Sequence, residues 1–159
     1  MKIRFSFIAL MALMVASGAL GAIAPRNNAG KHACKDCDAK FNLATYNIRY
    51  YSKGDSLAGN TWQRRSPQIA EVVRYHGFDI FGTQEGLKFQ LEDLKRFLPG
   101  FDYIGVGRDD GKTKGEHAAI FYDTTKFSPV DHGDFWLSET PDVPGLGWDA
   151  VCYRVCTCC

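Results

Sequence analysis

The sequence predicts an α/β or α+β domain with a mixed β-sheet. Patterns typical of strands and helices alternate over residues 41–98, and patterns typical of strands alone follow to the end of the chain. Alternating elements favour parallel neighbours in a sheet, whereas consecutive strands favour antiparallel pairs. The composition suits one packed domain, because 45% of the 159 residues are apolar and 13% are aromatic.

The first part of the domain is expected to be a strand, a loop and a helix. Apolar and polar residues alternate at 41–47, which predicts a strand, and the polar stretch 50–60 predicts a loop. Apolar residues recur every three or four positions over 62–76, which predicts an amphipathic helix. Pro67 is expected in its first turn, where a missing N–H is harmless, and Gly77 is expected to end it.

The rest of the domain is expected to add one helix and several strands. Residues 78–84 form a short apolar run that predicts a buried strand. Leucines at helical spacing predict a second helix from Leu87 to Leu98. The later strands begin with a β-hairpin that has a long polar connection. Their expected ranges are 101–106, 117–122, 135–138 and 148–157.

Residues 1–24 have the pattern of a secretory signal peptide. Lys2 and Arg4 precede an apolar run, and small residues follow as far as Ala24. A membrane anchor is the alternative, but serines and glycines interrupt the run, so no stable anchor is expected. Export predicts a secreted or periplasmic protein. Removing the segment changes the formal net charge from +1 to −1, which argues against a polybasic nucleic-acid coat.

The six cysteines lie near the two ends of the remaining chain. Cys34 and Cys37 form C-x-x-C in the leader 25–40, and further thiols crowd the C-terminus. A redox dithiol, half of a zinc site and a local disulfide are all open. The pair does not follow a strand and open a helix, as a thioredoxin-type site would, so a local disulfide or a loosely structured leader is favoured. A non-enzymatic secreted module held by disulfides or zinc is therefore an alternative function. Its thiols would be Cys34, Cys37, Cys156, Cys158 and Cys159.

Two polar side chains follow strands that are expected to be neighbours. Asn47 ends the strand at 41–47, and Glu85 follows the strand at 78–84. Ligands of α/β sheets bind outside the carboxyl ends of the strands, so both side chains should project at one edge. A carboxylate beside an amide oxygen suits Mg²⁺, which fills its octahedron with water and substrate phosphate. Capping or turn residues are the alternative interpretation.

Several short motifs, taken in order, resemble the endonuclease/exonuclease/phosphatase family, and together they extend over residues 41–157. The motifs lie at 45–49, 62–65, 79–85, 103–111, 115–116, 135–141 and 147–149. The resemblance implies a four-layer α/β sandwich, in which two sheets pack face to face between helices. It also implies metal-dependent hydrolysis of phosphoester bonds, with phosphodiesterase, nuclease and phosphatase actions all open.

The resemblance also assigns roles to five residues. Glu85 matches the family's metal-binding glutamate, and Asn47 matches the asparagine at the end of the first strand. Both residues are therefore expected to act in catalysis and to bind Mg²⁺ or Mn²⁺. Arg108 is expected to clamp a phosphate, with a solvated loop charge as its alternative. Tyr103 and Glu116 are expected to line the same cleft. The substrate could be nucleic acid, a phospholipid headgroup or a small phosphodiester, and no obligate protein partner is inferred.

The resemblance also predicts that the chain is incomplete. The second half of such a domain supplies an aspartate–asparagine pair and an Asp–His unit that activates water, and neither is found here. The last predicted strand runs to Cys159 with no cap or helix behind it. We therefore expect 41–159 to be the N-terminal part of a domain, ended by premature termination or a shifted reading frame. Little or no activity is expected of it alone.

Overall fold

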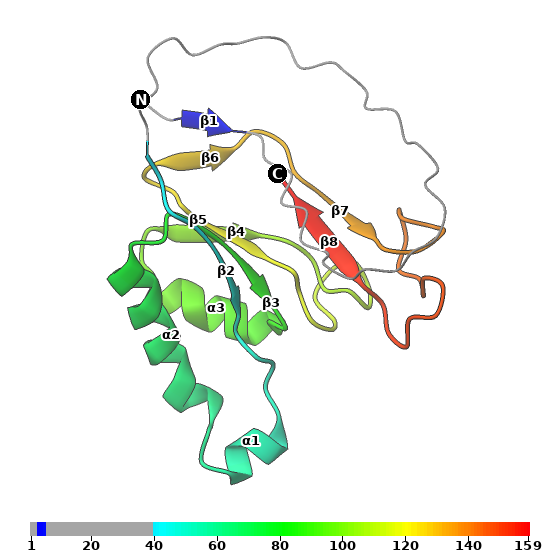
Figure 1. The fold of residues 1–159 in the computed structure, drawn as a ribbon, viewed down its shortest axis with the longest axis horizontal. Coiled ribbons are helices and arrows are strands. Elements are labelled where there is room, and N and C mark those ends of the chain that lie inside the picture. The colour runs from blue at the N-terminus through cyan, green and yellow to red at the C-terminus, as the bar shows by residue number, and fades with distance from the viewer. Residues whose placement is uncertain (1–2, 6–39) are drawn as a thin grey trace. The chain divides into compact units, whose positions relative to one another are not determined.

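The computed structural model describes residues 3–5 and 40–159. The expected signal peptide and cysteine-containing leader therefore lie outside the described residues, apart from strand β1 (Ile3–Phe5) and Lys40. Residues 41–159 form one compact unit, and β1 pairs in parallel with β6 (Figure 1). The other elements of this unit are β2 (Leu43–Asn47), α1 (Lys53–Leu57), α2 (Trp62–His76), β3 (Ile80–Gln84), α3 (Lys88–Phe97), β4 (Phe101–Ile104), β5 (Ile120–Asp123), β6 (Phe127–Pro129), β7 (Gly133–Trp136) and β8 (Val155–Cys158).

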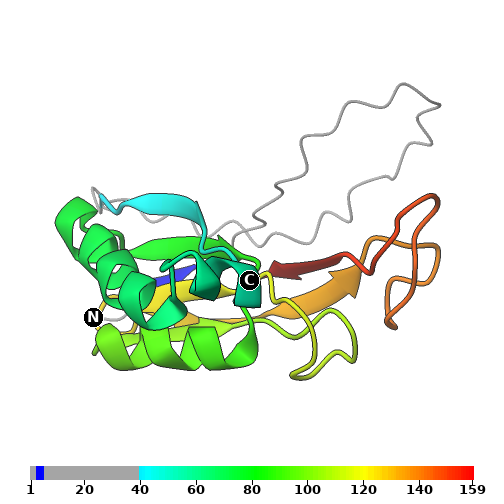
Figure 2. The same ribbon diagram turned by 90° about the horizontal axis from the view of Figure 1, so that it is seen from below.

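A mixed four-stranded sheet is the centre of the unit, as the sequence predicts. Its strand order is β2-β3-β5-β4, with β2 parallel to β3 and the other neighbours antiparallel. The β4–β5 pair is the expected hairpin with a long connection. Helices α2 and α3 lie on the same face of the sheet (Figures 1 and 2). The crossover from β2 through α2 to β3 is what makes those two strands parallel.

The main core fills the space between the sheet and the two helices. Phe81 of β3 and Phe121 of β5 stack with their ring centroids 4.9 Å apart, and both rings are fully buried. The helices contribute Trp62, Leu91 and Leu94, which are also buried. Burying each such side chain stabilises the fold by roughly 1.5–3 kcal/mol. This core fixes α2 and α3 on the sheet and so positions the segments that leave its carboxyl edge.

The opposite face of the sheet is less completely covered. Ile80, Ile120 and Phe127 form a small buried cluster there. Leu43 of β2 is 61% exposed. A separate two-stranded antiparallel sheet joins β7 to β8. The described residues thus contain a helix layer, a mixed sheet and pieces of further sheet, which is part of the predicted four-layer sandwich.

The structure differs from the sequence expectations in the first crossover. The predicted loop at 50–60 contains the short helix α1, because Ser52 caps it by accepting a hydrogen bond from the Asp55 N–H at 3.1 Å. Pro67 is not in the first turn of α2. Thr61 is the N-cap, so Pro67 is the sixth helical residue and lies inside the helix. Gly77 ends α2 in the left-handed conformation, as predicted.

The C-terminal strands also differ from their expected ranges. Strand β6 was not predicted, since three residues are too short for a recognisable alternation. The strand expected at 148–157 begins only at Val155, and residues 148–154 form turns and loop. The apolar alternation there does not reflect burial, because Val151 is exposed. Within the described ranges, no helix is long and apolar enough to cross a membrane.

Candidate active site

Asn47 and Glu85 meet at the carboxyl ends of two parallel strands. The register pairs Asn47 of β2 with Gln84 of β3, and Glu85 is the next residue. The Asn47 Nδ2 group donates a hydrogen bond of 2.8 Å to Glu85 Oε1. The predicted proximity of these two side chains is therefore confirmed, while their chemical roles remain predictions.

The orientation of the Asn47 amide follows from its neighbours. Its Oδ1 atom accepts a hydrogen bond of 2.8 Å from the Arg49 N–H, which can only donate. Its NH₂ group therefore faces the carboxylate of Glu85, which accepts when it is ionised. Asn47 thus holds the carboxylate in one orientation, and its own oxygen keeps one lone pair for another partner.

The backbone around this pair is strained. Glu85 has a φ of 63° and Arg49 a φ of 56°, which is the left-handed region that favours glycine. Such residues cost about 1–3 kcal/mol each and cluster at functional sites. Close packing holds the turn, since a Cβ on Gly86 would lie 2.6 Å from Leu91 Cδ2 of α3. The fold therefore fixes the backbone from which the Glu85 side chain projects at the sheet edge, and the hydrogen bond from Asn47 holds the side chain itself.

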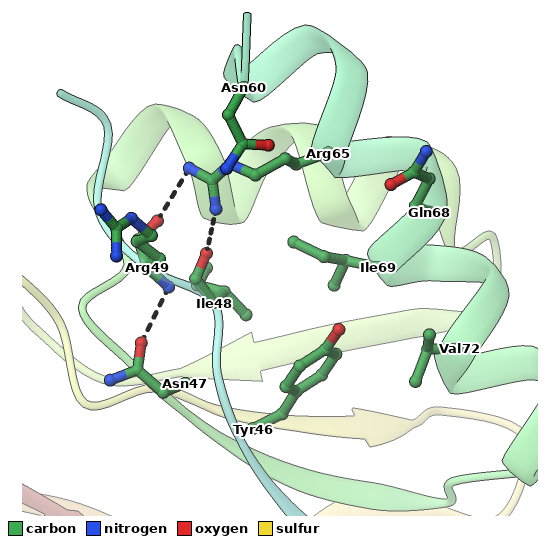
Figure 3. Close-up of a pocket in the computed structure, with 9 residues that line it drawn as sticks. All are labelled: Tyr46, Asn47, Ile48, Arg49, Asn60, Arg65, Gln68, Ile69 and Val72. Atoms are coloured by element: carbon green, nitrogen blue, oxygen red, sulfur yellow. Dashed lines mark hydrogen bonds between the residues drawn. The ribbon is translucent and has the colours of Figure 1, made fainter. Parts of the chain in front are cut away.

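Two side chains that the sequence analysis did not assign hold the segment after β2. Arg65 of α2 donates hydrogen bonds to the carbonyls of Ile48 at 2.8 Å and Arg49 at 3.2 Å (Figure 3). The buried amide of Gln90 donates to the Arg49 carbonyl at 3.1 Å and accepts from the Tyr51 N–H at 3.0 Å. Arg65 lies within a recognised motif, but no sequence pattern shows that these side chains point at β2.

A pocket of about 300 Å³ lies between this segment and α2 (Figure 3). It is mainly polar at the Asn60 and Gln68 side and apolar at the Ile69 side, and it reaches Asn47. Its lining residues are Tyr46, Asn47, Ile48, Arg49, Asn60, Arg65, Gln68, Ile69 and Val72.

Arg108 and Glu116 form an ion pair on the loop between β4 and β5. Arg108 Nη1 lies 3.0 Å from Glu116 Oε2, and the buried Nε, which has no hydrogen bond in the described part of the chain, lies 3.7 Å from Asp109 Oδ1. The structure thus brings these two predicted residues together. A guanidinium that carboxylates hold in place and that is still 20% exposed is suited to bind an anionic oxygen.

His117 connects this loop to the turn that carries Glu85. Its N–H donates to the Gly86 carbonyl at 2.8 Å, and it forms single β-bridges with both Gly86 and Gly107. The imidazole is buried, with Nδ1 3.2 Å from the Gly115 carbonyl oxygen. Burial lowers the pKa of His117, which favours the neutral ring. Glu85 and Arg108 therefore lie on segments that share one anchoring residue.

Tyr103 does not lie with the other predicted site residues. Its ring packs on the helix face of the sheet, 5.0 Å from Phe121. Its hydroxyl lies 2.6 Å from both Lys88 Nζ and Glu92 Oε1 of α3, and no hydrogen bond joins it to Asn47 or Glu85. Burial raises the pKa of Tyr103. The alternation of side chains along β4 turns this residue toward α3, away from the predicted cleft.

The Asn47–Glu85 pair fits a magnesium-type ion. Glu85 Oε2 accepts a long hydrogen bond of 3.3 Å from the Tyr50 N–H, which leaves acceptor capacity for a further ligand. The residues that the structure describes contain no group of three His, Cys, Asp or Glu side chains placed to hold a metal. Mg²⁺ does not require one, because it binds through one or two carboxylates and keeps water and substrate oxygens.

The C-terminal cysteines form neither a disulfide nor a metal cluster within the described residues. Cys152, Cys156, Cys158 and Cys159 are all free thiols. Burial raises the pKa values of Cys156 and Cys159, which disfavours the thiolate that binds zinc. The C-x-x-C pair of the leader lies outside the described residues.

Comparison with known proteins shows similarity to part of several longer chains. No protein-family model matches the chain. The solved structure of a mannosyl-6-phosphatase of Bacteroides thetaiotaomicron is 61% identical in sequence, with a TM-score of 0.73. The match covers 74% of this chain and 44% of the phosphatase chain. An endonuclease/exonuclease/phosphatase family protein of the same bacterium is 62% identical, with a TM-score of 0.73. That match covers 74% of this chain and 42% of the family protein. An uncharacterized protein of Acanthamoeba polyphaga mimivirus is 32% identical over 55% of this chain and 34% of its own. The chain thus spans less than half the length of each.

Proposed function

We propose a phosphoester-hydrolase function for this chain, which belongs to the endonuclease/exonuclease/phosphatase family. The observation that carries the proposal is the Asn47–Glu85 contact at the ends of two parallel strands. It places an oriented carboxylate where α/β sheets bind their ligands. The N-cap of α3 is Leu87, so Glu85 does not cap that helix, and its strained φ supports a functional role.

The residues of the chain would divide the work in the following way. Glu85 would hold Mg²⁺ or Mn²⁺, and Asn47 would keep the carboxylate in its binding orientation. The ion would act as a Lewis acid on a phosphoryl oxygen. Arg108, whose side chain is 20% exposed, would donate to another phosphate oxygen through the exposed part of its guanidinium, while Glu116 fixes that group. His117 would keep the two segments at a constant separation.

The proposed substrate class is a phosphomonoester of a sugar. The support is the 61% identity to a protein named mannosyl-6-phosphatase. The near-zero net charge of the chain also fits a small substrate better than a polyanion such as nucleic acid. We further propose that the protein is exported, on the signal-peptide pattern of residues 1–24.

We propose that the 159-residue chain alone binds metal and phosphate but turns over slowly. The support is its span of 44% of the solved phosphatase, together with the water-activating groups that the family resemblance places in a second half. Ligand binding and turnover then depend on different parts of the site, so the two can be measured separately.

The test is phosphate release from mannose 6-phosphate with Mg²⁺, using this chain and a version extended through a family-like second half. The extended version should be faster, and Glu85→Gln should abolish its activity. Glu85→Gln should also remove Mn²⁺ binding measured by electron paramagnetic resonance in both versions. Glu71→Gln is the matched control, because Glu71 is an exposed carboxylate on α2. Unchanged turnover and unchanged Mn²⁺ affinity in Glu85→Gln would refute the assignment.

A further inference from the structure

We propose that the loop 137–150 binds the sugar ring of the substrate, with Trp148 as its stacking surface. This inference rests on the proposed sugar-phosphatase function and adds a second binding element to it. It depends on three observations: the loop is joined to the Arg108 segment, its backbone is tightly fixed, and it holds an indole in solvent.

The loop begins directly at the predicted phosphate-binding segment. The Trp136 indole at the end of β7 donates a hydrogen bond of 2.7 Å to the Arg108 carbonyl. Its ring also packs on the same loop, since a Cβ on Gly111 would lie 3.1 Å from Trp136 Cη2. Residues 137–154 and the loop that contains Arg108 lie on the same side of the unit in both views (Figures 1 and 2). The start of this loop is therefore anchored on the backbone of the Arg108 segment.

The backbone of the loop is fixed by its own contacts. A Cβ on Gly147 would lie 2.0 Å from the Leu137 carbonyl oxygen, so only glycine allows the two ends of the loop to approach so closely. The Leu137 N–H donates to the Arg154 carbonyl at 2.9 Å, and the Ala150 N–H donates to the Gly147 carbonyl at 2.8 Å. Trp148 is thus attached to a preformed turn, which lowers the entropy lost when a ligand binds.

Trp148 differs from the other two tryptophans in its exposure. Trp62 and Trp136 are 1% and 6% exposed, whereas Trp148 is 77% exposed. Its φ of 46° is in the left-handed region, so the turn presents the indole at a conformational cost. A large apolar ring that is displayed in this way, on a loop joined to the predicted phosphate-binding segment, is suited to cover one face of a ligand.

The charges of the loop favour a neutral polyhydroxyl ligand over a polyanion. Glu139, Asp142 and Asp149 are exposed on it, and residues 137–150 contain no lysine or arginine. Carboxylates accept hydrogen bonds from sugar hydroxyls and repel phosphates. The C–H face of a hexose fits the electron-rich face of an indole. The charges therefore favour the phosphate at Arg108 and the sugar ring at Trp148.

The test compares two phosphomonoesters that differ in the sugar ring. Binding of mannose 6-phosphate and of glycerol 3-phosphate to the full chain with Mg²⁺ is measured by titration calorimetry. Trp148→Ala should weaken mannose 6-phosphate about tenfold and glycerol 3-phosphate less than about twofold. Trp148→Phe should restore most of the difference. Tyr75→Ala is the matched control, because Tyr75 is an aromatic residue of α2 with 86% exposure, and it should change neither affinity.

Several outcomes would overturn the inference. These are no binding of mannose 6-phosphate to the wild-type chain, no change in Trp148→Ala, or equal weakening of both esters. A different outcome is that the wild-type chain binds phosphatidylcholine vesicles or single-stranded DNA and loses that binding in Trp148→Ala, while the affinity for mannose 6-phosphate stays the same. That result would assign the loop to a membrane or to nucleic acid. Trp148-dependent mannose 6-phosphate binding without phosphate release from the extended version would refute the proposed activity and leave the sugar-binding loop standing.

Discussion

Arg65 provides the most informative perturbation, because one side chain fixes the segment that carries Asn47 and Arg49. Its guanidinium donates to the Ile48 and Arg49 carbonyls and lies 5.4 Å from the centre of the Trp62 ring. Replacing it with methionine keeps much of the packing and removes the donors. Two net hydrogen bonds at about 1 kcal/mol each and a cation–π contact of about 0.5–1 kcal/mol predict a loss of about 2.5–3 kcal/mol.

The two carbonyls should contribute unequally to this loss. The Arg49 carbonyl keeps a hydrogen bond from the Gln90 amide, whereas the Ile48 carbonyl loses its side-chain donor. Arg65→Lys should therefore recover part of the stability by donating to Ile48 alone, which leaves a loss of about 1 kcal/mol.

The assay is urea unfolding of the wild type and the variants at constant m value. Arg64→Met is the control, since Arg64 is the exposed neighbour whose side chain donates a long hydrogen bond of 3.4 Å to the Gly59 carbonyl. It should cost less than about 0.5 kcal/mol. Mn²⁺ affinity should also fall in Arg65→Met, because Asn47 loses its fixed position beside Glu85. An Arg65→Met variant as stable as Arg64→Met, with unchanged Mn²⁺ affinity, would refute this reasoning.

Three further predictions follow from the same structure. A hydrogen bond from Arg49 lowers the pKa of Asp55 to about 2. The Asp55 carboxylate should therefore stabilise the fold fully above its ordinary pKa, and this stabilisation should fade as the pH falls toward about 2. In an NMR titration, Arg49→Gln should raise the pKa of Asp55. Burial lowers the pKa of His117, so below about pH 6.5 the unfolded chain binds a proton that the folded chain does not, and the free energy of unfolding should decrease. A free energy of unfolding that stays constant between about pH 7 and pH 5 would contradict this prediction. Gly107→Ala should lower the melting temperature measured by circular dichroism, because its Cβ would lie 2.2 Å from the Lys114 carbonyl oxygen; an unchanged value would exclude this close approach.

Much of the first half of the fold could be predicted from local patterns. The bounds of α2 and its end at Gly77 follow from helical spacing and a glycine in the left-handed conformation. The meeting of Asn47 and Glu85 follows from one rule, that a helical crossover joins parallel strands whose carboxyl ends share an edge.

The less accurate predictions concern features that depend on distant contacts. Tyr103 was placed in the cleft, but the face that β4 presents to α3 is set by its pairing with β5. The alternation at 148–154 predicted a strand, whereas the close approach of Gly147 to Leu137 folds that segment into a loop. Arg65 and Gln90 contact backbone that is 16 to 41 positions away in sequence, which no local pattern records.

The sequence by itself determined the class of the fold, the two helices, the family resemblance and the pair of residues at the sheet edge. These features depend on periodicity and on the order of elements, which neighbouring residues encode. The tertiary structure decided which side chains hold that pair, which predicted residue faces away from it, and that Trp148 stands in solvent on a loop whose first end is joined to the Arg108 segment by Trp136. These features depend on sheet register and on close backbone approach, which arise only when distant segments pack together.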